Sequence, residues 1–301
     1  MARKPDDHRS EWEPRRPPRP ASAAPDESPR RRRPSFLRSR WFHVWLLMLL
    51  LSLAFALVAK GTGNVAVVPA SFFYGAAAGP VALLVATHHR TGIATSAPAL
   101  TLMGAGLFGG GVALLLGGFY DALLIGVDDS VEILRVGFIE EPAKLVPVLV
   151  MALTGKVISK RAGVMAGLMV ATGFAVLESV SYAFSNMHHD NVFAADGILL
   201  MRGLTTPFSH LVWTGAICAA AFAVWERRGK VVVTPGILGV FVLVCILHSA
   251  NDGLLVMHDV PGVAHLLYLL VSVVSYVLYR RLTRDLTLPV LPAAPQTRTP
   301  A

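Results

Sequence analysis

The chain has 301 residues, of which 54% are hydrophobic and only 15% are charged, and its mean hydropathy is +0.57. This composition is too apolar for a soluble domain and is typical of a membrane protein. The net charge of +8 does not indicate nucleic-acid binding, because most of it lies in one short tail. The two cysteines, Cys218 and Cys245, fall inside apolar segments. We expect them to be packing residues rather than part of a disulfide, redox or metal motif.

The N-terminal 40 residues are rich in proline, arginine, serine and acidic residues, with an arginine run at 30–33. Nothing in residues 1–40 can form a core, so we expect a disordered basic tail. Next to a membrane span, the arginine run is expected to hold the N-terminus in the cytoplasm and to contact anionic lipid. The apolar run that follows is too long for a signal peptide and lacks a convincing cleavage site. Residues 285–301 are predicted to be a second disordered tail, which leaves 41–284 as the membrane domain.

Eight apolar segments follow the tail, and most are close to the ~20 residues that cross ~30 Å of hydrocarbon. Lysine and arginine concentrate in alternate loops, on the side of the N-terminal tail, whereas the opposite loops carry aspartates and Lys60 alone. The positive-inside rule therefore predicts an all-α, polytopic bundle of about eight spans in the cell membrane, with both termini cytoplasmic. Seven spans with one re-entrant segment fit the same pattern, because glycine and proline interrupt several segments. The segments lie approximately at 41–59, 65–86, 98–118, 131–154, 162–185, 199–225, 234–256 and 262–281.

Glycines are frequent in two of these segments. The segment 98–118 carries many of them, and Gly163 and Gly167 open the segment 162–185. Small residues at such spacings let helix backbones approach closely, so we expect packing surfaces there.

The segment 136–150 carries two carboxylates and an ammonium group in the middle of an apolar run: Glu140, Glu141 and Lys144. An ionised group at bilayer depth costs about 2.5–3.5 kcal/mol on insertion scales, so such residues usually carry function or a partner. On a helix, Glu140 and Lys144 share a face, while Glu141 points about 100° away from Glu140. A structural ion pair with Lys144 would explain one glutamate and leave the other unexplained.

Three further spans carry ionisable residues in their interiors. Counting 1.5 Å per residue puts their carboxylates and imidazoles, like Glu140, about 11–16 Å from the outer ends of the spans. Glu178 alone would serve as a counter-ion for Arg202 or Lys144, but independent structural residues have no reason to share one depth. We therefore predict a single functional site in the outer half of the membrane. Its further candidates are Phe174 and Glu178 in 162–185, His210 in 199–225, and His248, Asn251 and Asp252 in 234–256.

The order of these motifs resembles the PrsW family: Glu-Glu-x-x-Lys at 140–144, Phe-x-x-x-Glu at 174–178, a span-borne His210, and His-x-x-x-Asp at 248–252. These multi-span proteases are related to the type II CAAX-prenyl endopeptidases and to bacteriocin-processing membrane proteins. The resemblance covers roughly residues 130–255. It implies an intramembrane peptidase, and the best-known relative cleaves an anti-sigma factor on the extracytoplasmic side. It also implies that Glu140 and Glu141 are the catalytic pair, with Glu178, His210 and His248 in the other motifs.

Peptide hydrolysis at this site needs an activated water, an oxyanion stabiliser and a proton donor for the leaving amine. No serine or cysteine has an evident base partner, so a water-activating glutamate fits better than covalent catalysis. One of Glu140 and Glu141 would activate water with His248. His210, helped by Asp252 or Asn251, would bind the oxyanion or donate the proton. Lys144 would hold the other glutamate, and the sequence does not decide which glutamate takes which role.

Two alternatives stand beside this expectation of cofactor-free catalysis on a membrane-anchored protein substrate. His210, His248 and Glu141 would suit Zn²⁺ with a water as the fourth ligand, although no His-x-x-x-His pair preforms such a site on one helix. Intramembrane acids and imidazoles also mark proton or cation pathways in transporters. A transporter needs acids along a path through the bilayer, whereas these share one layer near one face, which favours the peptidase.

Overall fold

The computed structural model describes residues 36–93, 97–124, 129–185, 187, 192–255 and 261–287 of the chain. Most of the two predicted tails therefore lies outside the described residues. At the C-terminal boundary the turn Arg284–Leu286 is helical and Leu286 is buried. The folded domain thus extends slightly beyond the predicted limit at residue 284.

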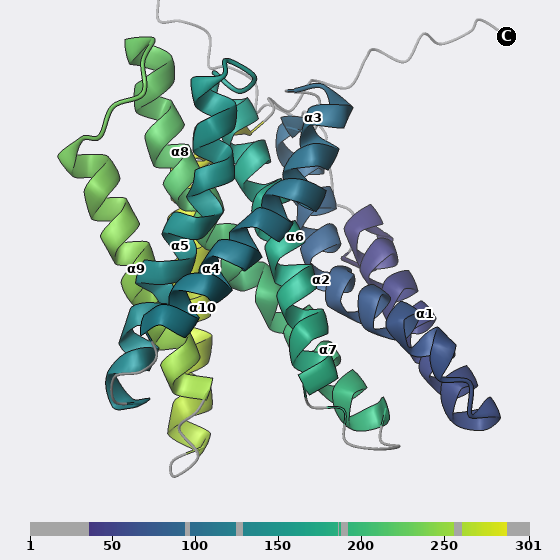
Figure 1. Ribbon diagram of the computed structural model, residues 1–301. Helices are drawn as coiled ribbons and strands as arrows, with labels where there is room; N and C mark the ends of the chain where they lie inside the picture. Colours follow the sequence, from purple (N-terminus) through teal and green to yellow (C-terminus); the bar gives the residue numbers. More distant parts are fainter. Residues whose placement is uncertain are drawn as a thin grey trace, which may run out of the picture. The chain divides into compact units, whose positions relative to one another are not determined.

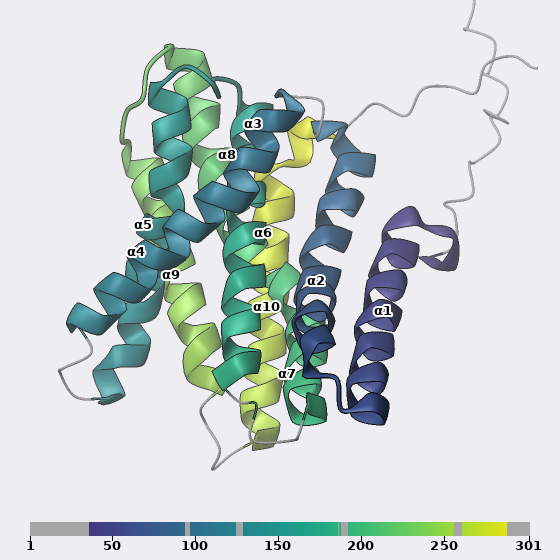
Figure 2. The same ribbon diagram turned by 45° about the vertical axis from the view of Figure 1, so that its right-hand side comes forward.

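The described residues form helices and no β-strand, in agreement with the all-α prediction (Figures 1 and 2). Helix α1 lies at the edge of the bundle beside α2 in both views, and serines join the two helices. Ser52 Oγ donates to the Ser71 carbonyl at 2.9 Å, and Ser71 Oγ donates to the Ser52 carbonyl at 2.8 Å.

The α-helices are α1 Arg40–Thr62, α2 Val68–Thr91, α3 Ala99–Gly104, α4 Gly110–Leu124, α5 Asp129–Leu153, α6 Lys160–Ser185, α7 Val192–Thr205, α8 His210–Arg228, α9 Pro235–Leu255 and α10 Pro261–Leu282. Shorter turns are η1 Phe36–Arg38, η2 Val65–Val67, the π-helical η4 Ala105–Gly109, η5 Thr206–Phe208 and η6 Arg284–Leu286.

Seven helical segments of the described chain are long and apolar enough to cross a membrane, and they coincide with seven of the eight predicted spans. This confirms a multi-pass helical membrane protein. The eighth predicted span is α5, whose 25 residues also suffice in length at 1.5 Å per residue. It differs from the others because Glu140, Glu141 and Lys144 concentrate charge at its centre. The orientation of the termini stays a prediction.

Glycines allow the closest helix contacts, as the glycine-rich segments predict. A Cβ added to Gly110 of α4 would lie 2.6 Å from Cα of Gly173 in α6, so these two backbones touch. Gly163 and Gly167, on α6, face Phe222 and Cys218 of α8. Helix α6 is thereby held between α4 and α8. Cys218 and Cys245 are both buried free thiols, as expected.

A third glycine brings α5 against α9. The N–H of Gly137 donates to Ser249 Oγ at 3.1 Å, and an added Cβ would lie 2.9 Å from that same oxygen. Gly137 lies one turn before Glu140, and Ser249 follows His248. The close approach therefore puts the two glutamates of α5 next to the imidazole of α9.

The predicted span 199–225 is interrupted in the middle. Helix α7 ends at Thr205, the turn η5 follows, and α8 begins at His210. Pro207 has no N–H to donate and disfavours helical geometry in the residue before it. Ser209 completes the break with φ −119° and ψ −104°. Such irregular backbone is tolerated at membrane depth where protein covers it, and Thr206 and Ser209 are both buried. The break makes His210 the first residue of a helix.

The predicted cytoplasmic loops meet at one end of the bundle. Arg90, at the end of α2, donates to Thr283 Oγ1 at 3.0 Å. Lys160, at the start of α6, bonds both oxygens of Asp285 at 2.8 and 2.9 Å, and its backbone N–H donates to Glu226 of α8. These loops thus share a side, as the charge pattern requires.

Candidate active site

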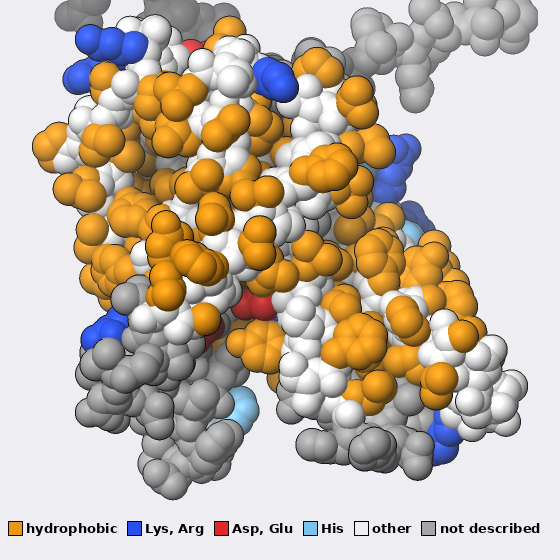
Figure 3. Space-filling view, in the orientation of Figure 1, with side chains coloured by type: hydrophobic (Ala, Val, Ile, Leu, Met, Phe, Trp, Pro, Cys, Tyr) orange, Lys and Arg blue, Asp and Glu red, His pale blue; other side chains and the backbone are white. Residues whose placement is uncertain are grey.

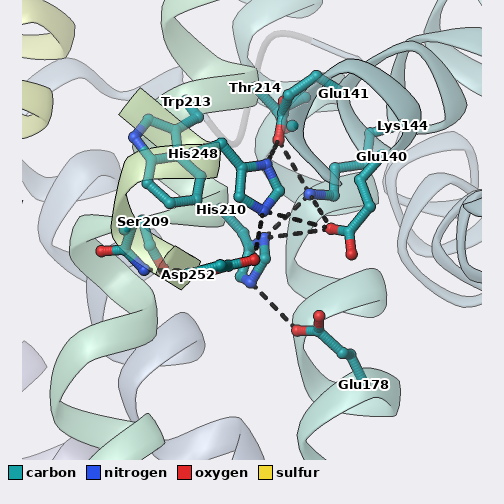
Figure 4. Close-up of polar contacts among 12 residues, drawn as sticks. Glu140, Glu141, Lys144, Glu178, Ser209, His210, Trp213, Thr214, His248 and Asp252 are labelled. Carbon is teal, nitrogen blue, oxygen red and sulfur yellow. Dashed lines mark hydrogen bonds and ion pairs between the residues drawn. The ribbon is translucent and has the colours of Figure 1, made fainter. Parts of the chain in front are cut away.

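Four helices bring carboxylates, imidazoles and one ammonium group into a single buried cluster (Figure 4). The sequence placed these residues in one layer, and the structure brings them within contact distance of one another. The contributing residues are Glu140, Glu141 and Lys144 of α5, Phe174 and Glu178 of α6, His210 of α8, and His248 and Asp252 of α9.

Lys144 lies at the centre of the cluster. Its Nζ donates to Glu140 Oε2 at 3.1 Å, to Glu141 Oε1 at 2.9 Å and to His210 Nδ1 at 2.9 Å. The ammonium also lies 4.1 Å from the centre of the Phe174 ring, a cation–π contact. The sequence assigned Lys144 to one glutamate, but it holds both, because residues three and four positions back on a helix are both within its reach.

The two glutamates differ in how many of their oxygens are occupied. Glu141 Oε1 accepts from Lys144 and from His248 Nδ1 at 3.0 Å, and Oε2 accepts from Thr214 Oγ1 at 3.1 Å. Among the described residues, Glu140 accepts a hydrogen bond only through Oε2. Both oxygens of Glu141 therefore accept hydrogen bonds from neighbouring side chains, whereas Oε1 of Glu140 is available to another ligand.

His248 faces two carboxylates with a nitrogen that makes no hydrogen bond. Its Nδ1 donates to Glu141, and its ring stacks on Trp213 with the ring centres 4.4 Å apart. Nε2 is buried without a hydrogen-bond partner in the described part of the chain, 3.5 Å from Glu140 Oε2 and 3.4 Å from Asp252 Oδ2. Since Nδ1 carries the proton, Nε2 presents a lone pair to two anionic oxygens. That arrangement is unfavourable unless a cation or a proton lies between them.

His210 has the opposite arrangement of its two nitrogens. Nε2 lies 3.1 Å from Glu178 Oε2, so it is the donor, and Nδ1 accepts from Lys144. Nδ1 also faces Glu140 Oε2 at 4.0 Å. Both imidazoles therefore turn towards the same glutamate the ring nitrogen that does not donate to Glu141 or Glu178.

Glu140, His210 and His248 offer three ligand atoms that all lie within 4.8 Å of one another. Two ligands about 2.0–2.1 Å from zinc in tetrahedral geometry lie about 3.3 Å apart, close to the separation of Glu140 Oε2 from His248 Nε2. The sequence-based ligand set contained Glu141 instead, but both oxygens of Glu141 are already used. The donor set of the described residues fits a divalent metal ion.

The charges of the cluster point in the same direction. In the described part of the chain, four carboxylates face two fixed cations, Lys144 and Arg202, so two negative charges remain uncompensated when both imidazoles are neutral. Buried carboxylates are costly without pairing, and a dication would restore the balance. The carboxylates are those of Glu140, Glu141, Glu178 and Asp252.

The sequence model of the PrsW family of intramembrane metalloproteases matches residues 66–279, from η2 into α10. The chain belongs to this family. No curated protein and no solved structure matches it. Membership makes this PrsW protein an intramembrane protease, so the transporter alternative loses its support. The family description as metalloproteases, together with the Glu140–His210–His248 group, leaves the expectation of cofactor-free catalysis unsupported.

The two remaining predicted residues lie at the edge of the PrsW cluster. Asp252 contacts His248, and its side chain is 32% exposed, the largest value in the cluster. Asn251 is buried and reaches the cluster through Asp252, to which its Nδ2 donates at 3.3 Å.

Sequence reasoning missed Trp213 and Thr214, which contact His248 and Glu141. The signal that identifies them is helical spacing: they follow His210 by three and four residues and so share its face of α8. Because α8 begins at His210, this face starts at the break itself.

The outer surface of this PrsW protein is largely apolar on the face shown in Figure 3. Acidic side chains are nevertheless visible at the bottom of a hollow near the middle of that face.

Proposed function

We propose that this PrsW protein is a metal-dependent peptidase that cleaves membrane-anchored proteins, with Glu140, His210 and His248 as the metal ligands. The observation that carries the proposal is the buried Nε2 of His248, which lacks a hydrogen bond and faces Glu140 Oε2 at 3.5 Å. A buried imidazole nitrogen without a partner is costly, and a metal ion would use its lone pair.

When bound, a zinc ion supplies a Lewis acid for the scissile carbonyl and a way to generate a nucleophile from water near neutral pH. The protein's own residues orient the ligands. Glu141 holds the proton on Nδ1 of His248, and Glu178 holds the proton on Nε2 of His210. Carboxylates behind histidine ligands fix the tautomer in this way and raise the basicity of the ligating nitrogen.

Asp252 is the carboxylate that we assign to proton transfer. It lies beside Nε2 of His248 and is the most exposed acid of the cluster. Water and substrate approaching from outside therefore reach its Oδ2 before they reach the buried glutamates. Asp252 would accept a proton from the attacking water and deliver it to the amine that leaves. Asn251, which donates to Asp252 Oδ1, would orient the carboxyl group.

The substrate that suits this location is a single-span or lipid-anchored polypeptide. The predicted depth of the cluster, about 11–16 Å from the outer face by helix rise, makes it reachable from outside the cell. An anti-sigma factor is the substrate that the family resemblance suggests. Comparing membrane-protein fragments in cells that express wild-type protein or Glu140→Gln would identify it, and fragments cut on the cytoplasmic side would contradict the depth assignment.

The experiment that tests metal dependence uses the purified full-length protein in detergent micelles. We expect about one zinc ion per chain, loss of cleavage after treatment with a chelator, and recovery when Zn²⁺ is returned. His210→Ala should lose both the zinc and the activity. Cleavage that survives complete removal of zinc would overturn the proposal.

One observation favours a second mechanism on the same residues. The ammonium of Lys144 bonds Glu140 Oε2 and His210 Nδ1, two of the three ligand atoms, so metal loading must break two of its hydrogen bonds. If Lys144 keeps its place, Glu140 acts as the base that activates water without a metal. In that case the chelator has no effect, and His210→Ala retains a residual rate, because one lost stabilising donor costs about 10²–10³-fold.

A further inference from the structure

Arg202 connects the broken helix to the cluster. It lies in the last turn of α7, before the break at Thr206–Phe208, and its side chain is 19% exposed. Its Nη2 donates to the Glu178 carboxylate, and its Nε donates to Ser179 Oγ at 2.8 Å. The guanidinium carbon also lies 4.6 Å from the centre of the Tyr182 ring. All three contacts are made to one turn of α6.

The same oxygen of Glu178 serves both sides of the break. Oε2 accepts from Arg202, which precedes the break, and from Nε2 of His210, which follows it. The carboxylate therefore joins the two halves of the interrupted span through α6. Any rotation of Glu178 away from Arg202 also removes the acceptor that fixes the His210 ring.

We infer that Arg202 is a positioning residue that acts through Glu178 to hold His210 with its proton on Nε2. This inference rests on the proposed function, in which Nδ1 of His210 must stay unprotonated and turned towards Glu140. Without Arg202, Glu178 would be held by a single donor and could adopt other rotamers. His210 would then be held mainly by the Lys144 ammonium at Nδ1, so its preference for one tautomer would weaken.

A guanidinium group suits this role and an ammonium group does not. The planar guanidinium donates from Nη2 and Nε in fixed directions, so Glu178 and Ser179 are bonded at the same time. A lysine at position 202 would supply the charge but not both directed bonds. Arg202→Lys should therefore restore only part of what Arg202→Met loses.

The direct test is the tautomer of His210 in full-length, zinc-free protein labelled with ¹⁵N-histidine. Comparison with His210→Asn identifies the His210 signals. We expect wild type to show the proton on Nε2, and Arg202→Met to show a mixture of tautomers. Arg90→Met is the matched control, because it removes another part-buried arginine that bonds a threonine far from the cluster. An unchanged His210 tautomer in Arg202→Met would overturn the inference.

A second measurement asks whether Arg202 works through Glu178. Partners of metal-bound histidines usually contribute about 10–100-fold to metal affinity, so Glu178→Gln should weaken zinc binding by that factor and Arg202→Met by about tenfold. The double variant should bind zinc as Glu178→Gln does, within about twofold. Effects that multiply in the double variant would show that Arg202 acts independently.

The two outcomes separate this inference from the proposed function. If wild type binds no zinc, metal dependence fails, and the tautomer measurement still decides the role of Arg202. If Arg202→Met does not fold, Ser179→Ala removes one of the two directed bonds and should give a smaller shift of the tautomer population in the same direction. Full recovery by Arg202→Lys would show that charge alone is sufficient and would contradict positioning by directed bonds.

Discussion

Two polar regions of this PrsW protein differ in how their charges are compensated. At the end of the bundle, Lys160 pairs with Asp285, and Arg161 donates to the Leu286 carbonyl at 3.2 Å. Asp285 is 58% exposed, so water shares in its solvation. In the cluster between α5, α6, α8 and α9, the three glutamates are buried, Asp252 is partly exposed, and these acids outnumber the cations of the described residues.

This difference distinguishes polar contacts that join segments of the fold from polar groups that suit a chemical function. A solvated, balanced pair joins two segments and contributes about 0–1 kcal/mol. A buried cluster with excess negative charge does not stabilise the fold in this way. The free energy needed to remove its carboxylates from water exceeds the free energy gained from their ion pairs. The excess of negative charge suits a bound cation, which is the reason for proposing that the function lies in this region.

The largest expected effect comes from an acid substitution made in each region. Glu140→Gln keeps the shape of the side chain but removes a charged metal ligand, so we expect cleavage to fall by more than about 10³-fold. Glu226 accepts the backbone N–H of Lys160 at the end of the bundle, outside the cluster, so Glu226→Gln should cleave at the wild-type rate. Turnover of a membrane-anchored reporter by purified protein measures both. Equal losses in the two variants would remove the distinction between the regions.

An intermediate effect is expected for Glu141, which orients His248 in the proposed mechanism. Glu141→Gln can still accept from His248 but loses its charge, so zinc affinity should fall by about 10–100-fold. Thr214→Val removes one hydrogen bond from an uncharged donor, while Glu141 keeps its charge and its bonds to Lys144 and His248, so the cost should be about tenfold or less. Zinc titrations of the two variants check this order. A complete loss of zinc in Glu141→Gln, with zinc retained in Glu140→Gln, would exchange the roles of the two glutamates.

Much of this site can be predicted from the sequence, because the depth of a residue in the membrane follows from counting residues along its helix. Helical rise alone put Glu140, Glu178, His210 and His248 in one layer, and they do lie together. Counting residues cannot assign the separate roles of Glu140 and Glu141, because these depend on which carboxylate accepts the hydrogen bond from Thr214 on another helix.

The fold was predictable to the same extent. The apolar segments predict the helices, but the interruption before His210 also depends on how the buried residues Thr206 and Ser209 pack between helices. Arg202 suggested only a counter-ion in the sequence. Its link to His210 appears once the break brings residues 202 and 210 to one carboxylate.

A packing variant tests whether the cluster depends on close backbone approach. Gly137→Ala would place a methyl group against the Cys245 carbonyl and Ser249 Oγ, separating α5 from α9. Overpacking of this kind costs about 1–3 kcal/mol, and zinc affinity should fall with stability. Gly118→Ala is the matched control, since nothing lies within 4 Å of its added Cβ. Thermal unfolding of both variants in micelles measures the difference, and equal melting temperatures would contradict the contact.

The smallest expected effect belongs to the balanced region. Partial burial acts to raise the pKa of Asp285, but the hydrogen bonds and charge of Lys160 outweigh it and hold that pKa below its usual range. The pair therefore stabilises the folded state above the unfolded pKa of about 4, and the contribution is lost as the pH falls through the lower folded value. Asp285→Asn should cost less than about 1 kcal/mol at pH 7 and less still in high salt, because exposed pairs are screened. Unfolding measured at both salt concentrations checks this, with zinc affinity unchanged. A loss of zinc binding in Asp285→Asn would mean that the end of the bundle and the cluster are coupled, and that the two regions cannot be treated as separate.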